Sequence, residues 1–166
     1  MRSLPRAFTD YEGQVHRDYS RGRALVPQVG AHWFRAFAES LPPQRPLHGL
    51  DLGSGTGRFS PALADAFGPV LAVEPSSAMR HVAERDAAHQ LVRYASGTAE
   101  NIPASDASLD YALLYLVWHH VADPARAARE IVRVLRPGGT ALGRIPVEPF
   151  VNASQSAEVN PAAARV

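Results

Sequence analysis

A short apolar segment that runs directly into a glycine-rich turn limits the fold of this chain more than any other feature of its sequence. Residues 47–52 are mainly apolar, and the turn Gly53-Ser54-Gly55-Thr56-Gly57 follows them. Five apolar side chains then recur at the spacing of one helix face, namely Phe59, Ala62, Leu63, Ala66 and Phe67. A strand, a glycine turn and a helix in this order predict a site where a ligand approaches the backbone at the start of the helix.

The remaining sequence repeats this alternation of apolar strands and helical patterns. Further strands are expected at 70–73, 91–95, 109–116 and 140–145. Further helices are expected at 27–41, 78–88 and 124–135, the last burying Ala128, Ile131, Val132 and Leu135. Such alternation predicts a doubly wound α/β fold, a mainly parallel sheet of about five strands with helices on both faces.

Length and composition indicate one globular domain. The 166 residues are 46% hydrophobic and 20% charged, an ordinary balance for a folded protein. The pattern divides them into an N-terminal arm at 1–26, a core at 27–146 and a poorly structured tail at 147–166, which is rich in small and polar residues.

Composition also excludes several kinds of chemistry. All 17 basic residues are Arg and Cys is absent, which excludes a Schiff-base lysine, a P-loop lysine, disulfides and cysteine nucleophiles. The net charge of +1 argues against a nucleic-acid partner, and no apolar run approaches the ~20 residues of a membrane span. The N-terminus has no signal-peptide core. We therefore expect a cytoplasmic protein without a nucleic-acid or membrane partner.

The spacing of the glycine turn distinguishes between cofactors. A dinucleotide site needs a third glycine or alanine where this chain has Arg58, and Gly57 comes one residue early, so a nicotinamide or flavin nucleotide is disfavoured. Glu74 ends the second strand, 21 residues after Gly53. A carboxylate there can accept both hydroxyls of an adenosine ribose. The alternative is a solvated acid at a strand end.

Four segments together resemble a known family. LDLGSGTGRFS (50–60), LAVEPS (71–76), GTAENIPASDASLDYALLYLVWHHV (97–121) and LRPGG (135–139) are similar to class I S-adenosylmethionine-dependent methyltransferases. The type 11 branch, which includes the ubiquinone and menaquinone biosynthesis methyltransferases, is the best match. The resemblance implies a Rossmann-like sheet of order 3-2-1-4-5 and S-adenosyl-L-methionine as the cofactor. It also implies methyl transfer by in-line displacement to a small-molecule acceptor.

The same resemblance implies cofactor contacts for matched positions. Asp51 would lie near the amino group of the methionine part. Gly53, Ser54 and Gly55 would line that part and the ribose, and Leu116 would touch the methionine end.

At the adenine, the resemblance implies that Pro75 and Met79 flank the ring and that Ala99 contacts its edge. The family often has Asp where this chain has Thr98. The Thr hydroxyl can still accept from the adenine amino group, without charge assistance, and Glu100 is the candidate to compensate.

Two pairs of residues outside these motifs are further candidates. Tyr19 and Arg23 resemble a Tyr…Arg pattern in a segment that family members fold over the donor as a lid; the alternative is a solvated arm. His119 and His120 follow the fourth strand and are weak candidates for a general base, needed only if the acceptor loses a proton. The alternative is that one His caps the next helix or packs against Trp118. No metal site is expected.

The family's sheet has seven strands, the last two forming an antiparallel hairpin, and this hairpin is expected to be missing here. The fifth strand would then be a bare edge, open to a homodimer or a partner chain. Three functions therefore stay open: a methyltransferase, a truncated non-catalytic remnant that binds the cofactor or a partner, and, disfavoured by Arg58, a nicotinamide-dependent oxidoreductase.

Overall fold

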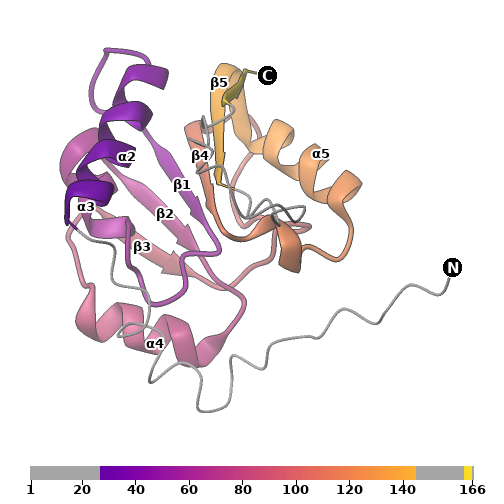
Figure 1. Ribbon diagram of the computed structural model, residues 1–166. Coiled ribbons are helices and arrows are strands. Elements are labelled where there is room, and N and C mark those ends of the chain that lie inside the picture. Colours follow the sequence, from indigo (N-terminus) through magenta and orange to yellow (C-terminus); the bar gives the residue numbers. More distant parts are fainter. Residues whose placement is uncertain (1–26, 145–162, 166) are drawn as a thin grey trace, which may run out of the picture.

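The computed structural model describes residues 27–144 and 163–165, which form a twisted sheet covered by helices on both faces (Figure 1). The strands are ordered β3-β2-β1-β4-β5-β6. Their bounds are Gly49–Leu52 (β1), Val70–Val73 (β2), Val92–Ala95 (β3), Leu109–Tyr115 (β4), Leu135–Arg144 (β5) and Ala163–Arg165 (β6). The first five strands are parallel, which confirms the predicted order 3-2-1-4-5.

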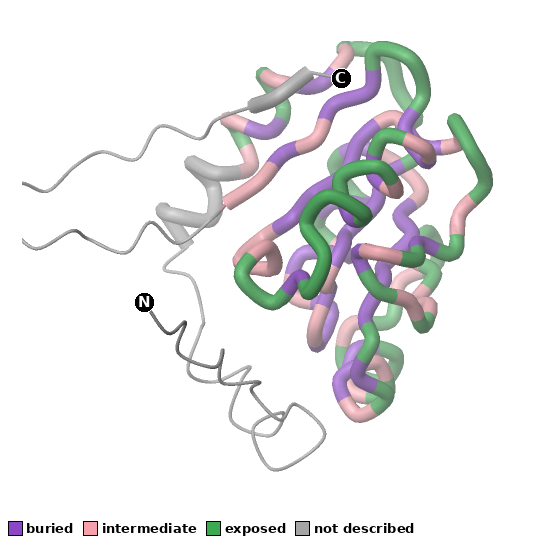
Figure 2. The backbone as a smooth tube through the Cα atoms, turned by 90° about the vertical axis from the view of Figure 1, so that its right-hand side faces the viewer, coloured by how far each residue is buried: buried purple, intermediate pink, exposed green. Residues whose placement is uncertain are grey.

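In the described part of the chain, four α-helices connect or flank these strands: α2 (Pro27–Ser40), α3 (Ser60–Phe67), α4 (Ser77–Asp86) and α5 (Pro124–Val134). A short 3₁₀ helix, Trp118–His120, follows β4. One half of the core packs α2 and α3 against the sheet through Phe37, Leu63 and Phe67. The other half packs α5 against the opposite face through Ala127, Ile131 and Val134. Burial is concentrated on the central strands, as Figure 2 shows.

The inner face of α5 differs from the prediction. Ile131 is buried as expected, but Ala127 and Val134 lie beside it. Ala128 is exposed, and so is Val132, with 51% of its surface accessible. Leu135 is buried, but as the first residue of β5 rather than the last of the helix. The apolar residues of 124–135 fit two helix faces one position apart, and packing against the sheet selects the face of Ala127, Ile131 and Val134.

The start of β5 also comes earlier than expected. Leu135 pairs with Leu109, and the next pair joins Thr140 to Tyr111, so four residues of β5 bulge out against one residue of β4. Gly138, at φ +79°, lies in this bulge. Residues 136–139, between the expected helix at 124–135 and the expected strand at 140–145, therefore form a bulge within the strand.

The C-terminal segment contains a strand that the sequence did not indicate. Residues 163–165 form β6, which pairs antiparallel with β5 in the register Thr140↔Arg165, Ala141↔Ala164 and Leu142↔Ala163. The expectation of a bare fifth strand is thus wrong for residues 140–142. The expected arm at 1–26 and most of the expected tail lie outside the described residues. Within the described part of the chain, no helix has the length and apolar character to cross a membrane.

Candidate functional site

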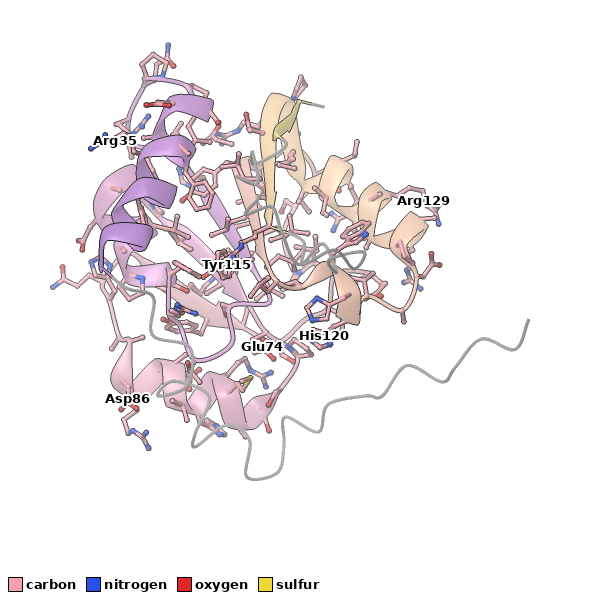
Figure 3. The ribbon with its side chains drawn as sticks, viewed as in Figure 1. Arg35, Glu74, Asp86, Tyr115, His120 and Arg129 are labelled. Atoms are coloured by element: carbon pink, nitrogen blue, oxygen red, sulfur yellow. The ribbon has the colours of Figure 1, made fainter. Side chains whose placement is uncertain are left out.

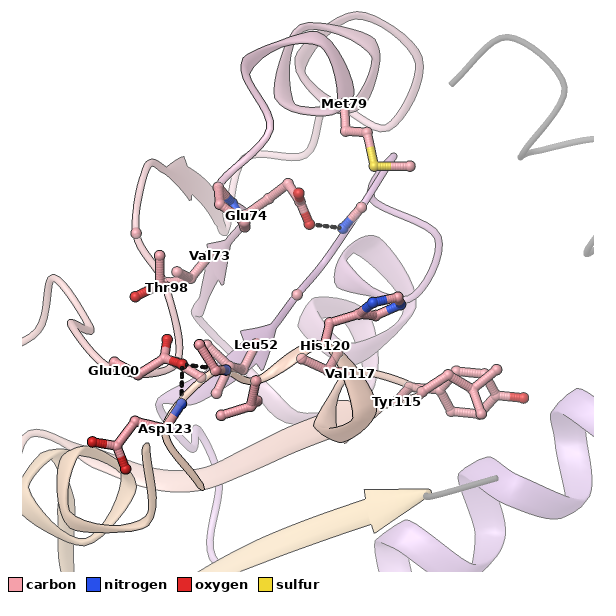
Figure 4. A pocket seen from close by; sticks show the side chains of 18 of the residues that line it. Leu52, Val73, Glu74, Met79, Thr98, Glu100, Tyr115, Val117, His120 and Asp123 are labelled. Carbon is pink, nitrogen blue, oxygen red and sulfur yellow. Dashed lines mark hydrogen bonds between the residues drawn. The ribbon is translucent and has the colours of Figure 1, made fainter. Parts of the chain in front are cut away.

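The candidate site is a cavity of about 540 Å³ at the carboxyl ends of β1, β2 and β4 (Figure 4). Its walls are the turn after β1, the start of α4, the loop after β3 and the segment that joins β4 to α5. Parallel α/β sheets bind ligands beyond the carboxyl ends of their strands, where the strand order reverses. Here that reversal lies between β1 and β4.

Most of the predicted cofactor residues come together in this cavity. The wall includes Gly53, Gly55, Glu74, Pro75, Met79, Thr98, Ala99, Glu100 and Leu116. Asp51 and Ser54 are buried and are not part of the wall. Tyr19 and Arg23 lie outside the described residues, so the expected lid stays a prediction.

The glycine turn folds tightly against its neighbours. Gly53 has φ +71°, and a Cβ atom there would lie 2.4 Å from Cγ2 of Val117. Gly57 has φ +78°, and a Cβ atom there would lie 2.4 Å from the hydroxyl of Tyr94. Both positions therefore need glycine for backbone conformation and for space. The third glycine serves this packing at position 57 and leaves position 58 to an arginine.

Glu74 lines the cavity, and backbone hydrogen bonds fix the orientation of its carboxylate. Only 6% of its surface is exposed, its Oε2 accepts from the backbone N–H of Gly55 at 3.0 Å, and its Oε1 accepts from that of Ser76 at 3.0 Å. Ser76 is the N-cap of α4, its hydroxyl accepting from the N–H of Met79. Carboxylate oxygens accept more than one hydrogen bond each, so these contacts orient Glu74 without closing it to donors in the cavity. The alternative of a solvated strand-end acid is wrong.

Asp51 is a second carboxylate, buried behind the turn with 2% of its surface exposed. Its Oδ2 accepts from the hydroxyl of Ser60 at 2.6 Å. Burial raises the pKa of Asp51 to about 6, the Ser60 hydrogen bond opposes this, and the charge of Glu74 adds to it. A cation close to this buried carboxyl group would stabilise its ionised form.

At the end of the cavity away from Tyr115, Glu100 holds the loop after β3 against the start of α5. Its Oε1 accepts from the N–H groups of Ala122 at 2.8 Å and Asp123 at 3.1 Å (Figure 4). Partial burial acts to raise the pKa of Glu100, but hydrogen bonds from Asp123, Ala122 and Thr98 outweigh it and lower the pKa. The carboxylate thus positions the cavity wall, whereas Ala99 beside it is buried and Thr98 is exposed.

The two histidines lie in the 3₁₀ helix with their ring centroids 3.9 Å apart. Both are exposed, and His120, unlike His119, is part of the cavity wall. Neither caps α5, because Asp123 is the N-cap and accepts from the N–H of Arg126 at 3.0 Å. No three His, Asp or Glu side chains of residues 27–144 and 163–165 gather as metal ligands would.

Several wall residues were not among the predicted contacts, including Leu52, Val73, Tyr115, Val117 and Arg126. Most of them end a strand or directly follow one. The sequence signal that these residues share is the carboxyl end of a strand. This signal predicts that a residue lies at this edge of the sheet, but not which way its side chain points.

The fold and this site define a Rossmann-like α/β domain with a cavity at the strand reversal, where folds of this class bind their ligands. Comparison with known proteins identifies the family within this class. The profile of the methyltransferase domain family, type 11, matches residues 50–143. The chain belongs to this family, and S-adenosyl-L-methionine is the cofactor that membership implies.

Individual relatives agree with this assignment. An uncharacterised methyltransferase of Mycobacterium tuberculosis is 43% identical over 121 residues, which cover 73% of this chain and 46% of that protein. The ubiquinone/menaquinone biosynthesis C-methyltransferase of Rubrivivax gelatinosus is 36% identical over 64% of this chain and 42% of its own. A Haloferax volcanii methyltransferase, solved with the Trm112 methyltransferase activator, superposes with a TM-score of 0.69 at 25% identity, covering 84% of this chain and 62% of that structure. The chain thus spans about half the length of the curated relatives it matches.

Proposed function

We propose that this chain binds S-adenosyl-L-methionine in the cavity and catalyses methyl transfer to a small-molecule acceptor. The single observation that carries the proposal is Glu74, a buried carboxylate held by two backbone N–H groups at the carboxyl end of β2. That arrangement suits the two hydroxyls of a ribose. A cytoplasmic location is part of the proposal.

The residues present fit this cofactor. The hydroxyl of Ser54 is buried and has no hydrogen-bond partner among the described residues, so it can serve a polar group of a ligand at the turn. Asp51, behind the turn, would favour the cofactor's ammonium group, which would offset the burial of its charge. Pro75, Met79 and Ala99 supply an apolar surface for the adenine.

When bound, the cofactor supplies a methyl group already activated by a sulfonium, so the protein's main tasks are to orient and to desolvate. The new bond forms between the acceptor atom and the methyl carbon as the carbon–sulfur bond breaks. Gly53, Gly55 and Leu116 would fix the methionine end of the cofactor. If the acceptor must lose a proton, His120 is the residue on the wall that can take it near neutral pH.

Calorimetric titration of S-adenosylhomocysteine tests the cofactor site. We expect micromolar binding to the chain and a loss of about tenfold or more, ~1.4 kcal/mol, in Glu74→Ala. Glu84→Ala, which removes an exposed carboxylate on α4, is the matched control and should bind as the parent does. A folded parent chain that does not bind S-adenosylhomocysteine would contradict the proposal.

A second candidate function is cofactor binding without catalysis. The same titration would then succeed, but no acceptor would be methylated. Turnover of any acceptor by the chain would eliminate this candidate. A nicotinamide nucleotide is less compatible with the site, because Arg58 stands at the position of the third glycine.

A further inference from the structure

Two arginines converge on Tyr115, at one end of the cavity. The guanidinium carbon of Arg58 lies 5.9 Å from the centre of the Tyr115 ring, and that of Arg144 lies 5.2 Å from it. Arg58 follows the glycine turn, Tyr115 is the last residue of β4 and Arg144 is the last residue of β5. Three elements distant in sequence thus bring two positive charges to one aromatic side chain.

Ring contacts hold Arg58 in place and leave its polar edge open. Its guanidinium carbon is also 5.2 Å from the ring of Phe59, which packs on Tyr115 with ring centroids 4.5 Å apart. Within residues 27–144 and 163–165, Arg58 makes no hydrogen bond and no ion pair. A guanidinium has five N–H donors in one plane, and stacking on a ring occupies its face rather than those donors.

Arg144 is oriented by the same tyrosine, since its guanidinium donates to the Tyr115 hydroxyl. The cavity acids Glu100 and Asp123 lie at the opposite end from Tyr115, as Figure 4 shows. Arg58 and Arg144 therefore lie beside the Tyr115 end of the cavity without being part of its wall. The arginine of the wall, Arg126, is at the other end, three residues after Asp123.

The position of these arginines relates them to the reacting end of the site. Tyr115 and Leu116 are consecutive and both line the cavity, and Leu116 is the residue proposed to touch the methionine end of the cofactor. A group bound beside Tyr115 would adjoin that end, where the acceptor must enter. A planar guanidinium matches carboxylate and phosphate groups in shape and charge.

We infer that Arg58 and Arg144, held on Tyr115, form an anion-binding site that selects a methyl acceptor carrying a carboxylate or phosphate group. This inference rests on the proposed function for the identity of the acceptor. The cofactor's own carboxylate has the same chemistry, so the experiment must separate the two sources.

The test uses benzoate, phenyl phosphate and neutral benzamide as probes, titrated by NMR into the chain saturated with S-adenosylhomocysteine. We expect both anions to bind and benzamide to bind at least about tenfold more weakly. The double substitution of Arg58→Gln with Arg144→Gln should weaken the binding of benzoate by about tenfold or more. Arg129→Gln, an exposed arginine on α5 far from Tyr115 in Figure 3, is the control and should change nothing.

Titrating the same variants with S-adenosylhomocysteine and with 5′-methylthioadenosine, which lacks the amino-acid part, separates the two sources of the anion. Unchanged affinity for both supports an acceptor site. If the variants bind S-adenosylhomocysteine more weakly but 5′-methylthioadenosine with unchanged affinity, the arginines bind the cofactor's carboxylate and the inference is overturned. Equal binding of benzamide and benzoate to the parent chain would overturn it as well.

Two further measurements cover the cases in which the double variant unfolds or the parent chain does not bind S-adenosylhomocysteine. If the double variant unfolds, judged by circular dichroism, Arg58→Gln alone takes its place, because Arg58 makes only ring contacts in the described residues. If the parent chain does not bind S-adenosylhomocysteine, the proposed function fails. Benzoate titrated into the cofactor-free parent and variants then decides the anion site by itself, and equal binding to both would overturn it.

Discussion

At Asp51 the chain buries a carboxylate whose folded-state pKa, about 6, is raised above the ordinary value of 3.8. The folded state therefore holds this proton more tightly than the unfolded state, and stability falls as the pH rises from about 4 to about 6. Asp51→Asn keeps an acceptor for Ser60 and removes the charge. We expect the variant to match the parent at pH 4 and to be more stable at pH 7.5 by roughly 3 kcal/mol, an upper limit from two pKa units. Urea unfolding at both pH values measures this, and an equal difference at both would contradict it.

At Gly57, the turn depends on the absence of a side chain. An alanine there would meet the Tyr94 hydroxyl at 2.4 Å and would have to adopt φ +78°. We expect Gly57→Ala to destabilise the fold by about 2–5 kcal/mol, the sum of backbone strain and overpacking. Gly138 is a matched control, since it has φ +79° and a Cβ atom added there would meet nothing within 4 Å. Gly138→Ala should lose only the backbone contribution, about 1–2 kcal/mol. Equal losses in thermal unfolding would show that contact with Tyr94 is unimportant.

Among the elements, the loop after β3 and the start of α5 depend on one side chain. Glu100→Ala removes the acceptor for the N–H groups of Ala122 and Asp123, so we expect faster hydrogen exchange at both amides. Glu100→Gln keeps the oxygen and should retain part of the protection. Because the pKa of Glu100 is lowered on folding, its charge stabilises the fold above the ordinary carboxyl pKa of 4.5, and this contribution is lost as the pH falls through the folded-state pKa.

The control for this exchange experiment is Glu84→Ala, which removes an exposed carboxylate from α4. It should leave exchange at Ala122 and Asp123 unchanged. Unchanged exchange in Glu100→Ala would mean that the loop is held by its other contacts, chiefly the hydrogen bonds of Arg133 to the carbonyls of Ile102 and Ala104.

The elements predicted well are those whose pattern depends on local sequence. The glycine turn and the positions of the parallel strands follow from short-range signals, whereas the strand order 3-2-1-4-5 was implied by the family resemblance. The face of α5 and the bulge at Gly138 were missed because tertiary pairing decides them. The role of Glu100 as a holder of the wall was missed for the same reason, since its partners are more than twenty residues away.

For the whole molecule, the edge of the sheet is decided by a strand of three residues. β6 covers residues 140–142 of β5, and its sequence, Ala-Ala-Arg, carries no strand signal. An uncovered strand edge presents unpaired N–H and C=O groups that pair readily with another chain. The self-association expected of a bare fifth strand should therefore depend on whether β6 is present.

Removal of residues 163–166 tests this dependence. We expect the shortened chain to melt at a lower temperature and to form dimers or larger species whose proportion rises with protein concentration, measured by size-exclusion chromatography with light scattering. Removal of Val166 alone keeps all three paired residues and should leave both properties unchanged. If the shortened chain stays monomeric at the concentrations where the parent does, the pairing of β6 contributes little to protecting the edge. The residues of β5 beyond Leu142 would then have to resist association through their own geometry, with the partly buried Arg144 placing a charge at the end of the strand.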